Sequence, residues 1–225
     1  MTMNSESRSD RKRKTLLLAA TAVFLEKGYD GTSMDDVAAR AEVSKPTVYK
    51  YFSDKEHLFA EIVRATTDHI DDLVLLVVET MAADADVDTG LTVLARRFIN
   101  ALLQPEVLRL RRLVIANADR FPDVGRSWYE QGFERVLATL ATTFQSLAAR
   151  KLLTLVDPLL AANHFVGLLL WIPVNKALFT GDHHAIPDEL ERYALAAVRA
   201  FLTGYGPSRA MPARKEAATR TRRKG

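Results

Sequence analysis

The stretch EVSKPTVYKYF at residues 42–52 combines many polar side chains with two apolar anchors. Pro46 suits the first turn of a helix, where its missing N–H is not needed. With a rotation of about 100° per residue, Val48 and Phe52 fall on one side of that helix. The other faces carry Lys45, Pro46, Thr47, Tyr49 and Lys50. The pattern predicts a helix that is anchored by two apolar residues and presents polar groups to a partner.

Two helices are predicted just before this stretch. KTLLLAATAVFLEKG at 14–28 has the helical period, and Gly28 is placed to end it. SMDDVAARA at 33–41 begins with Ser33, a residue type that caps helix N-termini. Residues 42–44 then form a three-residue turn that ends in a second capping residue, Ser44. Two short helices separated by such a turn predict a helix-turn-helix.

A fourth helix is predicted after Phe52. In SDKE at 53–56, Ser53 and Glu56 have the spacing of a capping box. The apolar residues that follow extend the helical pattern to about Met81.

In a helix-turn-helix, the second helix enters the major groove of DNA and presents its N-terminal half to base edges. We therefore expect Pro46, Thr47 and Lys50 to face base edges, since Lys donates to guanine and a methyl or proline ring contacts thymine. Phosphate contacts are expected from helix N-termini and from side-chain donors beside them. The candidates are the helix N-termini at Ser33, Ser44 and Ser53 and the side chains of Thr32, Tyr49 and Lys55. Lys45, near the start of its helix, is also a DNA-binding candidate and is placed to reach sideways. The alternative at this point is an ordinary surface helix with its lysines in solvent.

The charge of the chain is concentrated at its two ends. The net charge is +3, yet residues 1–14 hold five Lys or Arg against two acidic residues, and residues 206–225 hold seven against one. The residues between them therefore sum to −6. Basic ends on an acidic body favour a polyanionic partner, although the C-terminal tail is also explained as a solvated tail. A non-specific nucleic-acid-binding protein acting through these arms is the alternative function.

The rest of the sequence also has helical periodicity, so an all-α fold is predicted. LTVLARRFINALL at 91–103 has one apolar stripe, and a largely apolar helix is expected from Pro158 to about Phe179. The last helix, from Asp188, has a stripe through Phe201. We expect the helices around 158–178 and 188–203 to form a homodimer interface.

Residue types and motifs argue against several other classes of protein. The chain has no cysteine, no G-x-S-x-G motif and no phosphate-binding glycine loop. Its five histidines lack the spacing of a zinc site, and the side chains of adjacent residues such as His183 and His184 are expected to diverge. We therefore expect no catalytic residues, no cofactor and no metal. The charged N-terminus and the absence of an apolar run of about 18 residues predict a cytoplasmic protein without a membrane span.

The segment GYDGTSMDDVAARAEVSKPTVYKYFSDKEHLF resembles the N-terminal signature of the TetR family of bacterial transcription regulators, over roughly residues 11–62. The matching positions are Phe24, Gly28, Thr32, Ala38, Val43, Ser44, Tyr49, Phe52, Lys55 and Leu58. The resemblance implies a three-helix DNA-binding domain joined to a larger helical domain that dimerises and often binds a small ligand. Pro46 departs from the glycine or alanine of many members, which leaves the base preference open.

The C-terminal part resembles the AefR-like subset of the same family, in LRRLVIANADRFPDVGRSWYEQG and DPLLAANHFVGLLL. Asn117 stands where that pattern has an acidic residue. The expected organisation is a flexible basic arm at 1–10, the helix-turn-helix domain at 11–60, a ligand-binding and dimerisation domain at 61–205, and a flexible basic tail at 206–225.

An apolar pocket with a few polar groups is expected in the C-terminal domain, chiefly from this resemblance. Its candidate lining residues are Phe98, Leu102, Asn117, Phe121, Trp128, Phe133, His164, Trp171 and Asn175. The aromatic members are equally explained as core, and His164 as an interior histidine. The predicted protein is a homodimeric repressor that binds a pseudo-palindromic double-stranded DNA operator and is released by a small hydrophobic effector.

Overall fold

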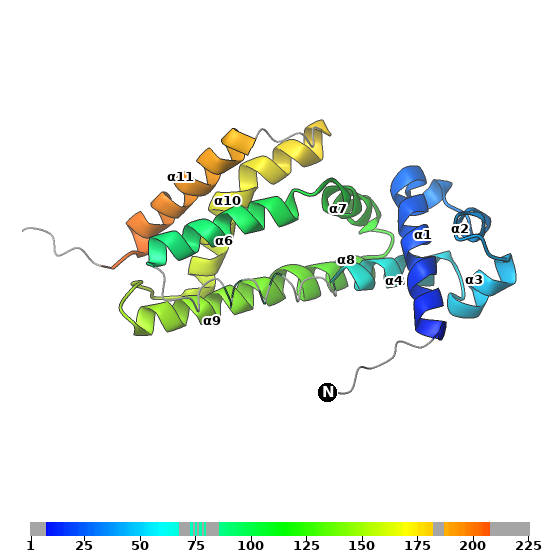
Figure 1. Ribbon diagram of the computed structural model, residues 1–225, viewed down its shortest axis with the longest axis horizontal. Coiled ribbons are helices and arrows are strands. Elements are labelled where there is room, and N and C mark those ends of the chain that lie inside the picture. The colour runs from blue at the N-terminus through cyan, green and yellow to red at the C-terminus, as the bar shows by residue number, and fades with distance from the viewer. Residues whose placement is uncertain are drawn as a thin grey trace, which may run out of the picture.

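The computed structural model describes residues 8–67, 86–181 and 187–207, together with Leu73, Leu75, Val77 and Glu79. All regular structure in these ranges is helical, which confirms the predicted all-α fold (Figure 1). The elements are α1 (Arg8–Gly31), α2 (Met34–Arg40), α3 (Lys45–Tyr51), α4 (Lys55–Thr67), α6 (Val87–Leu102), α7 (Pro105–Asn117), α8 (Pro122–Trp128), η1 (Tyr129–Glu134), α9 (Arg135–Ala149), α10 (Pro158–Thr180) and α11 (Pro187–Tyr205).

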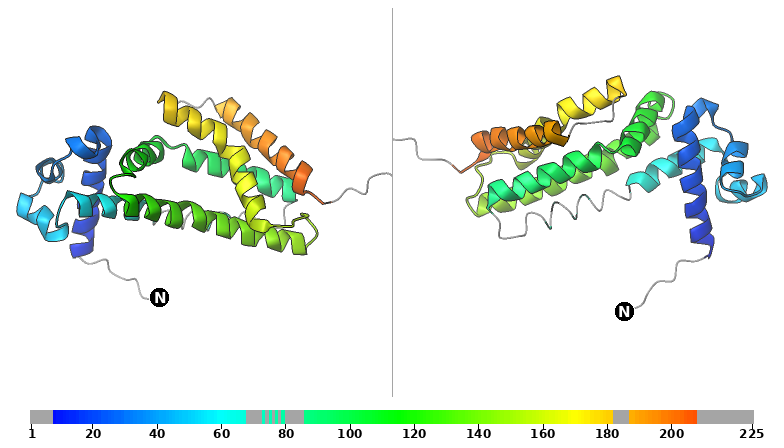
Figure 2. Two further views of the ribbon diagram at one scale, coloured as in Figure 1. Left: turned by 180° about the vertical axis from the view of Figure 1, so that it is seen from behind. Right: turned by 45° about the horizontal axis from the view of Figure 1, so that its top comes forward.

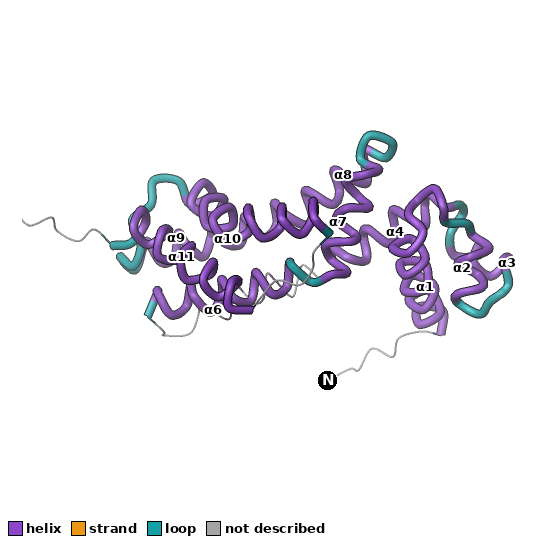
Figure 3. Tube along the Cα trace, turned by 90° about the horizontal axis from the view of Figure 1, so that it is seen from above, coloured by secondary structure: helices purple, strands orange, loops and turns teal. Residues whose placement is uncertain are grey.

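The helices form an elongated molecule with two hydrophobic cores. Helices α1, α2 and α3 lie at one end, α6, α9, α10 and α11 fill the other, and α4, α7 and α8 lie between them (Figures 1 and 3). The N-terminal core is built around Phe24, Phe52 and Phe59, and the C-terminal core around Phe98 and Phe165. This arrangement confirms the predicted small helix-turn-helix unit joined to a larger helical part.

The helix-turn-helix forms as its sequence predicts. Val48 and Phe52 have no exposed surface, so α3 is anchored by these two residues. Ser33 caps α2 in a complete capping box, in which its hydroxyl accepts from Asp36 N–H and the Asp36 carboxylate accepts from Ser33 N–H. Gly28 interrupts the helical backbone at φ 70° and ψ 178°, which turns the chain from α1 toward α2.

Two local expectations about this region are corrected. Helix α1 already begins at Arg8, inside the segment expected to be a flexible arm. The start of α4 is capped by Asp54 and not by a Ser53–Glu56 box, because the Asp54 carboxylate accepts from His57 N–H at 2.7 Å. The Ser53 hydroxyl instead donates to the Asp54 carboxylate at 2.9 Å.

The C-terminal core is formed mainly by α6, α9, α10 and α11. The apolar stripe of α11 lies inside the subunit, since Phe201 is 1% exposed and its ring lies 5.1 Å from Phe144 and 5.2 Å from Phe165. Phe201 therefore packs within the subunit, and the expected dimer interface through α10 and α11 stays a prediction. Helix α10 bends along its length, with Pro173 inside it (Figure 2).

Helix α10 also revises the expectation about membrane spans. Its 23 residues are apolar enough, by length and composition, to cross a bilayer. However, Ala161, Phe165 and Leu169 have no exposed surface, because this helix packs against α9 and α11 in the C-terminal core.

Helix α7 belongs to both cores. Leu108 is buried in the C-terminal core, whereas Leu110, Leu113 and Val114 are buried in the N-terminal core. Shortly after α7, Phe121 joins the N-terminal core, with its ring centroid 4.7 Å from that of Tyr29. The N-terminal hydrophobic unit therefore includes residues far beyond position 60.

Replacing Gly28 by alanine is expected to lower the free energy of unfolding by about 1–3 kcal/mol, because φ 70° and ψ 178° lie in a region that is essentially restricted to glycine. No atom within 4 Å would meet the added Cβ, so the penalty comes from the positive φ alone. Gly204→Ala is the matched control, because it adds a Cβ into equally open space on helical backbone and should be neutral or slightly stabilising. Urea denaturation measures both variants, and equal midpoints would show that the Gly28 backbone is not a constraint.

The capping box makes a second prediction, on pH dependence. Hydrogen bonds from Lys27 and then Ser33 lower the pKa of Asp36 from its ordinary 3.8 to about 2. A depressed folded-state pKa stabilises the protein above the unfolded value, and this contribution disappears as the pH falls from about 4 to about 2. The melting-temperature gap between wild type and Asp36→Asn should therefore be constant above pH 5 and close at low pH. A gap that stayed constant down to pH 2 would contradict the assignment.

Candidate nucleic-acid interface

The outward face of α3 carries most of the residues expected to contact DNA. Lys45, Pro46, Tyr49 and Lys50 are exposed, and Thr47 is partly exposed. Because Val48 and Phe52 are fully buried beneath them, these side chains stand on a rigid support. The structure thus brings the base-edge candidates Pro46, Thr47 and Lys50 onto one helix whose surface is open in the subunit.

The start of α3 is organised by two polar contacts. Ser44 precedes the helix, but its hydroxyl bonds the Thr47 hydroxyl at 2.8 Å and makes no side-chain cap to a backbone N–H. The Lys45 ammonium lies 2.9 Å from the Asp35 carboxylate of α2, and this hydrogen bond raises the pKa of Lys45. Both residues of the pair are exposed, so the ion pair is weak and a phosphate could compete with Asp35 for Lys45.

Two expected phosphate contacts have their polar groups bound inside the protein. Thr32 is 4% exposed, and its hydroxyl donates to the Gly28 carbonyl at 2.7 Å, so it braces the turn after α1. The Lys55 ammonium lies 4.4 Å from the centre of the Tyr29 ring and donates to the Asp30 carbonyl at 3.3 Å. Burial lowers the pKa of Lys55. The structure therefore gives these two side chains internal partners.

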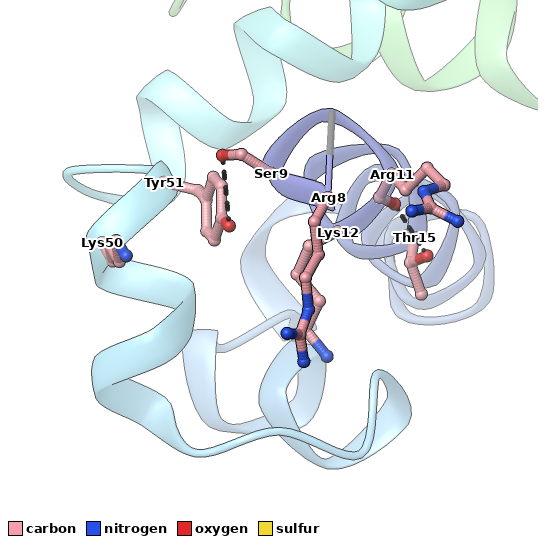
Figure 4. Close-up of a pocket in the computed structure, with 7 residues that line it drawn as sticks. All are labelled: Arg8, Ser9, Arg11, Lys12, Thr15, Lys50 and Tyr51. Atoms are coloured by element: carbon pink, nitrogen blue, oxygen red, sulfur yellow. Dashed lines mark hydrogen bonds between the residues drawn. The ribbon is translucent and has the colours of Figure 1, made fainter. Parts of the chain in front are cut away.

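The N-terminal end of α1 adds a cationic surface beside α3 that the motif analysis did not assign (Figure 4). An open hollow lies between the two helices, and the view shows Arg8 and Lys12 projecting from α1 into the region beside Lys50 and Tyr51 of α3. The residues that line it are Arg8, Ser9, Arg11, Lys12, Thr15, Lys50 and Tyr51. Four of these seven are cations and the other three carry hydroxyls, so the lining contains only groups that can donate to phosphate oxygens.

The signal for this hollow was present in the sequence as the basic run RKRK at 11–14. The side chains of this run lie on different faces of α1. Arg11 and Lys12 line the hollow, whereas Arg13 lies 5.7 Å from the centre of the Phe52 ring and pairs with Glu61 of α4. Only the tertiary structure distinguishes the residues of the run that hold the domain together from those that face the α3 side.

The nine candidate effector residues lie on several elements of the molecule. Phe98 and Leu102 belong to the C-terminal core, Phe121 and Trp128 pack in or against the N-terminal core, and Asn117 donates to the Leu113 carbonyl at the end of α7. The expected common pocket stays a prediction.

Three more candidates lie on the outward face of α10. His164 is exposed, with Nδ1 2.6 Å from the Tyr205 hydroxyl, so it is not an interior histidine. Trp171 is 69% exposed, and its carbonyl accepts from the Asn175 amide at 2.6 Å. Phe133 is the remaining candidate, and it contacts the Arg111 guanidinium and the Tyr129 ring.

Comparisons with known proteins agree with this geometry. Residues 16–62 match the family described as bacterial regulatory proteins, tetR family, and residues 89–207, more than half of the chain, match the AefR-like transcriptional repressor C-terminal domain. A solved structure of a TetR-family transcriptional regulator from Mesorhizobium loti is 52% identical, with a TM-score of 0.85 over 89% of this chain and 100% of that one.

Two other similar proteins have names that record different functional properties. The flavonoid-responsive regulator FrrA is 28% identical, with a TM-score of 0.69 over 88% of this chain and 98% of that one. The transcriptional activator FasR of Mycolicibacterium smegmatis is 39% identical over 77 residues, which are 34% of each chain. The chain thus spans only about a third of FasR in this match. The matched domains, the fold and the exposed α3 together show that this chain is a DNA-binding transcriptional regulator of the TetR family, with an AefR-like C-terminal domain.

Proposed function

We propose that the protein is a homodimeric repressor that binds a pseudo-palindromic operator and leaves it when a small, largely apolar molecule binds the C-terminal domain. The observation that carries the DNA part is the juxtaposition of the exposed α3 face with the cations of α1 around one hollow. The family description of the C-terminal domain supports repression. The name of FrrA supports an effector of small-molecule type. DNA as the partner supports a cytoplasmic location.

Within this proposal, base reading and phosphate binding are divided between α3 and α1. Lys50 and Thr47 stand on the anchored helix and are assigned to base edges, with Pro46 beside them. Arg8, Arg11 and Lys12 are assigned to phosphates, because guanidinium and ammonium groups that line an open surface contribute sequence-independent attraction. Lys50 belongs to both sets of residues, because it is a base-edge candidate and also lines the hollow.

The dimer is proposed to form through the outward face of α10. The large apolar residues of this face are between 45% and 87% exposed. They are Leu160, Leu168, Trp171, Ile172 and Phe179. Their spacing follows one helical stripe, which also carries His164 and Asn175. A second copy of the chain is the occupant that the DNA-binding role requires, because two recognition helices must reach successive major grooves about 34 Å apart.

The division of roles on the DNA surface predicts two kinds of variant. Lys50→Ala should change the order of preference among operator sequences, at a cost of about 1–3 kcal/mol on the best site. Lys12→Ala should weaken all sequences alike and reduce the salt slope of binding by about one per subunit. Mobility-shift titrations at several salt concentrations would measure both, with Arg150→Ala, far from α3, as the control. Parallel losses on every sequence for both variants would refute the division.

The proposed dimer interface on α10 can be tested with two matched charge substitutions, one inside it and one outside it. Trp171→Glu should give monomers by light scattering and weaken operator binding by about 10²-fold or more, because a monomer loses the second half-site. Val156→Glu is the control, since Val156 is also an exposed apolar residue but lies before α10, and this variant should remain dimeric. Phe201→Glu is unsuitable, because Phe201 is buried inside the subunit. A folded Trp171→Glu variant that stayed dimeric would place the interface elsewhere.

Repression itself is tested by transcription in vitro from the promoter beside the protein's own gene. Addition of the protein should reduce transcript in proportion to operator occupancy. An increase in transcript would instead assign the activator role that the name of FasR records.

A further inference from the structure

Two adjacent arginines on α7 face the C-terminal domain without an acidic partner. Arg111 and Arg112 lie one turn after Leu108, which is buried in the C-terminal core. Among the residues that the structure describes, the ion pairs join other cations to Asp and Glu, and none includes either guanidinium. Buried or half-buried arginines are ordinarily paired with a carboxylate, so this pair needs an explanation.

Arg112 has a buried donor for which no described group of the protein is an acceptor. Its Nη2 donates to the Ala177 carbonyl of α10 at 3.1 Å, which ties α7 to α10. Its Nε is buried and has no hydrogen-bond partner. An unsatisfied buried donor is unfavourable, and more so when it belongs to a charged group, so an acceptor supplied from outside the chain would stabilise this arrangement.

Arg111 is held against an aromatic pair in an unusual turn. Its guanidinium lies 4.9 Å from the centre of the Phe133 ring, and burial lowers the pKa of Arg111. Phe133 belongs to the π-helix η1 and stacks on Tyr129, with centroids 5.9 Å apart. Such widened turns occur frequently at functional sites. Helical periodicity in the sequence does not distinguish a π-helix from an ordinary helix, so this feature was visible only in the structure.

Apolar surface adjoins the two cations. Ile115, one turn after Arg111 and Arg112 on α7, is 58% exposed, and Tyr129 is 55% exposed. A ligand that satisfied the guanidinium groups could therefore bury an apolar body on neighbouring side chains. The combination selects molecules that have both an oxyanion and an apolar part.

We propose that Arg111 and Arg112 form the anion-recognition site of the effector, which is a molecule with one carboxylate or similar oxyanion joined to an apolar body. This inference rests on the proposed effector response. An oxyanion can accept from the Nε and Nη groups of Arg112 together, in the forked geometry that guanidinium prefers. It competes with the Ala177 carbonyl for Arg112, and α7 also carries residues of the N-terminal core, so the contact reaches the DNA-binding helices.

The test compares decanoate, below its critical micelle concentration, with decan-1-ol, which has the same chain length and no charge and is used below its solubility limit. Full-length wild type should bind decanoate at least about tenfold more tightly, measured by melting-temperature shift and Trp fluorescence. Arg111→Gln and Arg112→Gln should lose this preference and retain the response to decan-1-ol. Arg109→Gln is the control, because it removes an exposed cation from the same helix, and it should keep the preference.

Arg112→Lys is a second variant, chosen in case Arg112→Gln does not fold. It keeps a cation that can reach the Ala177 carbonyl, and it lacks the Nε donor. It should fold, as shown by circular dichroism, and bind decanoate more weakly than wild type. Equal affinity of wild type for decanoate and decan-1-ol, or no binding of either, would overturn the proposal. Equal losses in Arg109→Gln and Arg112→Gln would also overturn it, since they would show a general effect of charge.

Operator titrations on the same samples separate this inference from the proposed function. If decanoate binds through the arginines and operator affinity does not change, the anion site stands and the effector switch fails. If an uncharged apolar compound releases the operator and decanoate shows no preference for the arginines, the switch stands and the anion site fails.

Discussion

The structure depends on the burial of α7 in two separate hydrophobic cores. Leu108 packs in the C-terminal core, while Leu110, Leu113 and Val114 pack in the N-terminal core. Burial of each such side chain contributes about 1.5–3 kcal/mol, so the attachment amounts to several kcal/mol. The ion pair between Arg120 and Asp30, which also joins these parts, is exposed and contributes about 0–1 kcal/mol. Apolar burial therefore decides how the DNA-binding helices are held, and a displacement of α7 cannot leave them unaffected.

The cationic surface follows from the same packing. Helix α3 can offer Lys50 to a partner because Val48 and Phe52 anchor it from below, and α1 can offer Arg8 and Lys12 because its other face is buried in the N-terminal core. Neighbouring cations differ in their roles. Arg13 pairs with Glu61, Lys27 with Asp36 and Lys45 with Asp35, whereas the cations that line the hollow surround it together with hydroxyl groups alone. None of the residues that line the hollow is acidic, and four of them are cations.

Helix α10 connects the proposed dimer with the proposed effector site. One face is buried in the subunit, the other carries Trp171 and Phe179 to the surface, and the Ala177 carbonyl on its last turns accepts from Arg112 of α7. A ligand bound at Arg111 and Arg112 would act where α7, which supports the DNA-binding helices, meets α10, which carries the proposed contact with a second subunit. This gives a route by which binding could alter the separation of two recognition helices, provided that the ligand favours one arrangement over the other.

Local features were predictable from the sequence because they depend on a few neighbouring residues. Ser33 and Asp36 determine a capping box, Gly28 determines a break with positive φ, and the spacing of Val48 and Phe52 determines which face of α3 is buried. The family resemblance added the two-part organisation. The structure alone decided which apolar faces meet within a subunit. The stripe with Phe201 lies inside, and Trp171, from a helix that is apolar nearly all round, lies outside. It also decided that Phe98 and Phe121 belong to different cores and that Arg112 has an unsatisfied Nε. Periodicity shows that a face is apolar, but what covers that face depends on contacts between residues far apart in the chain.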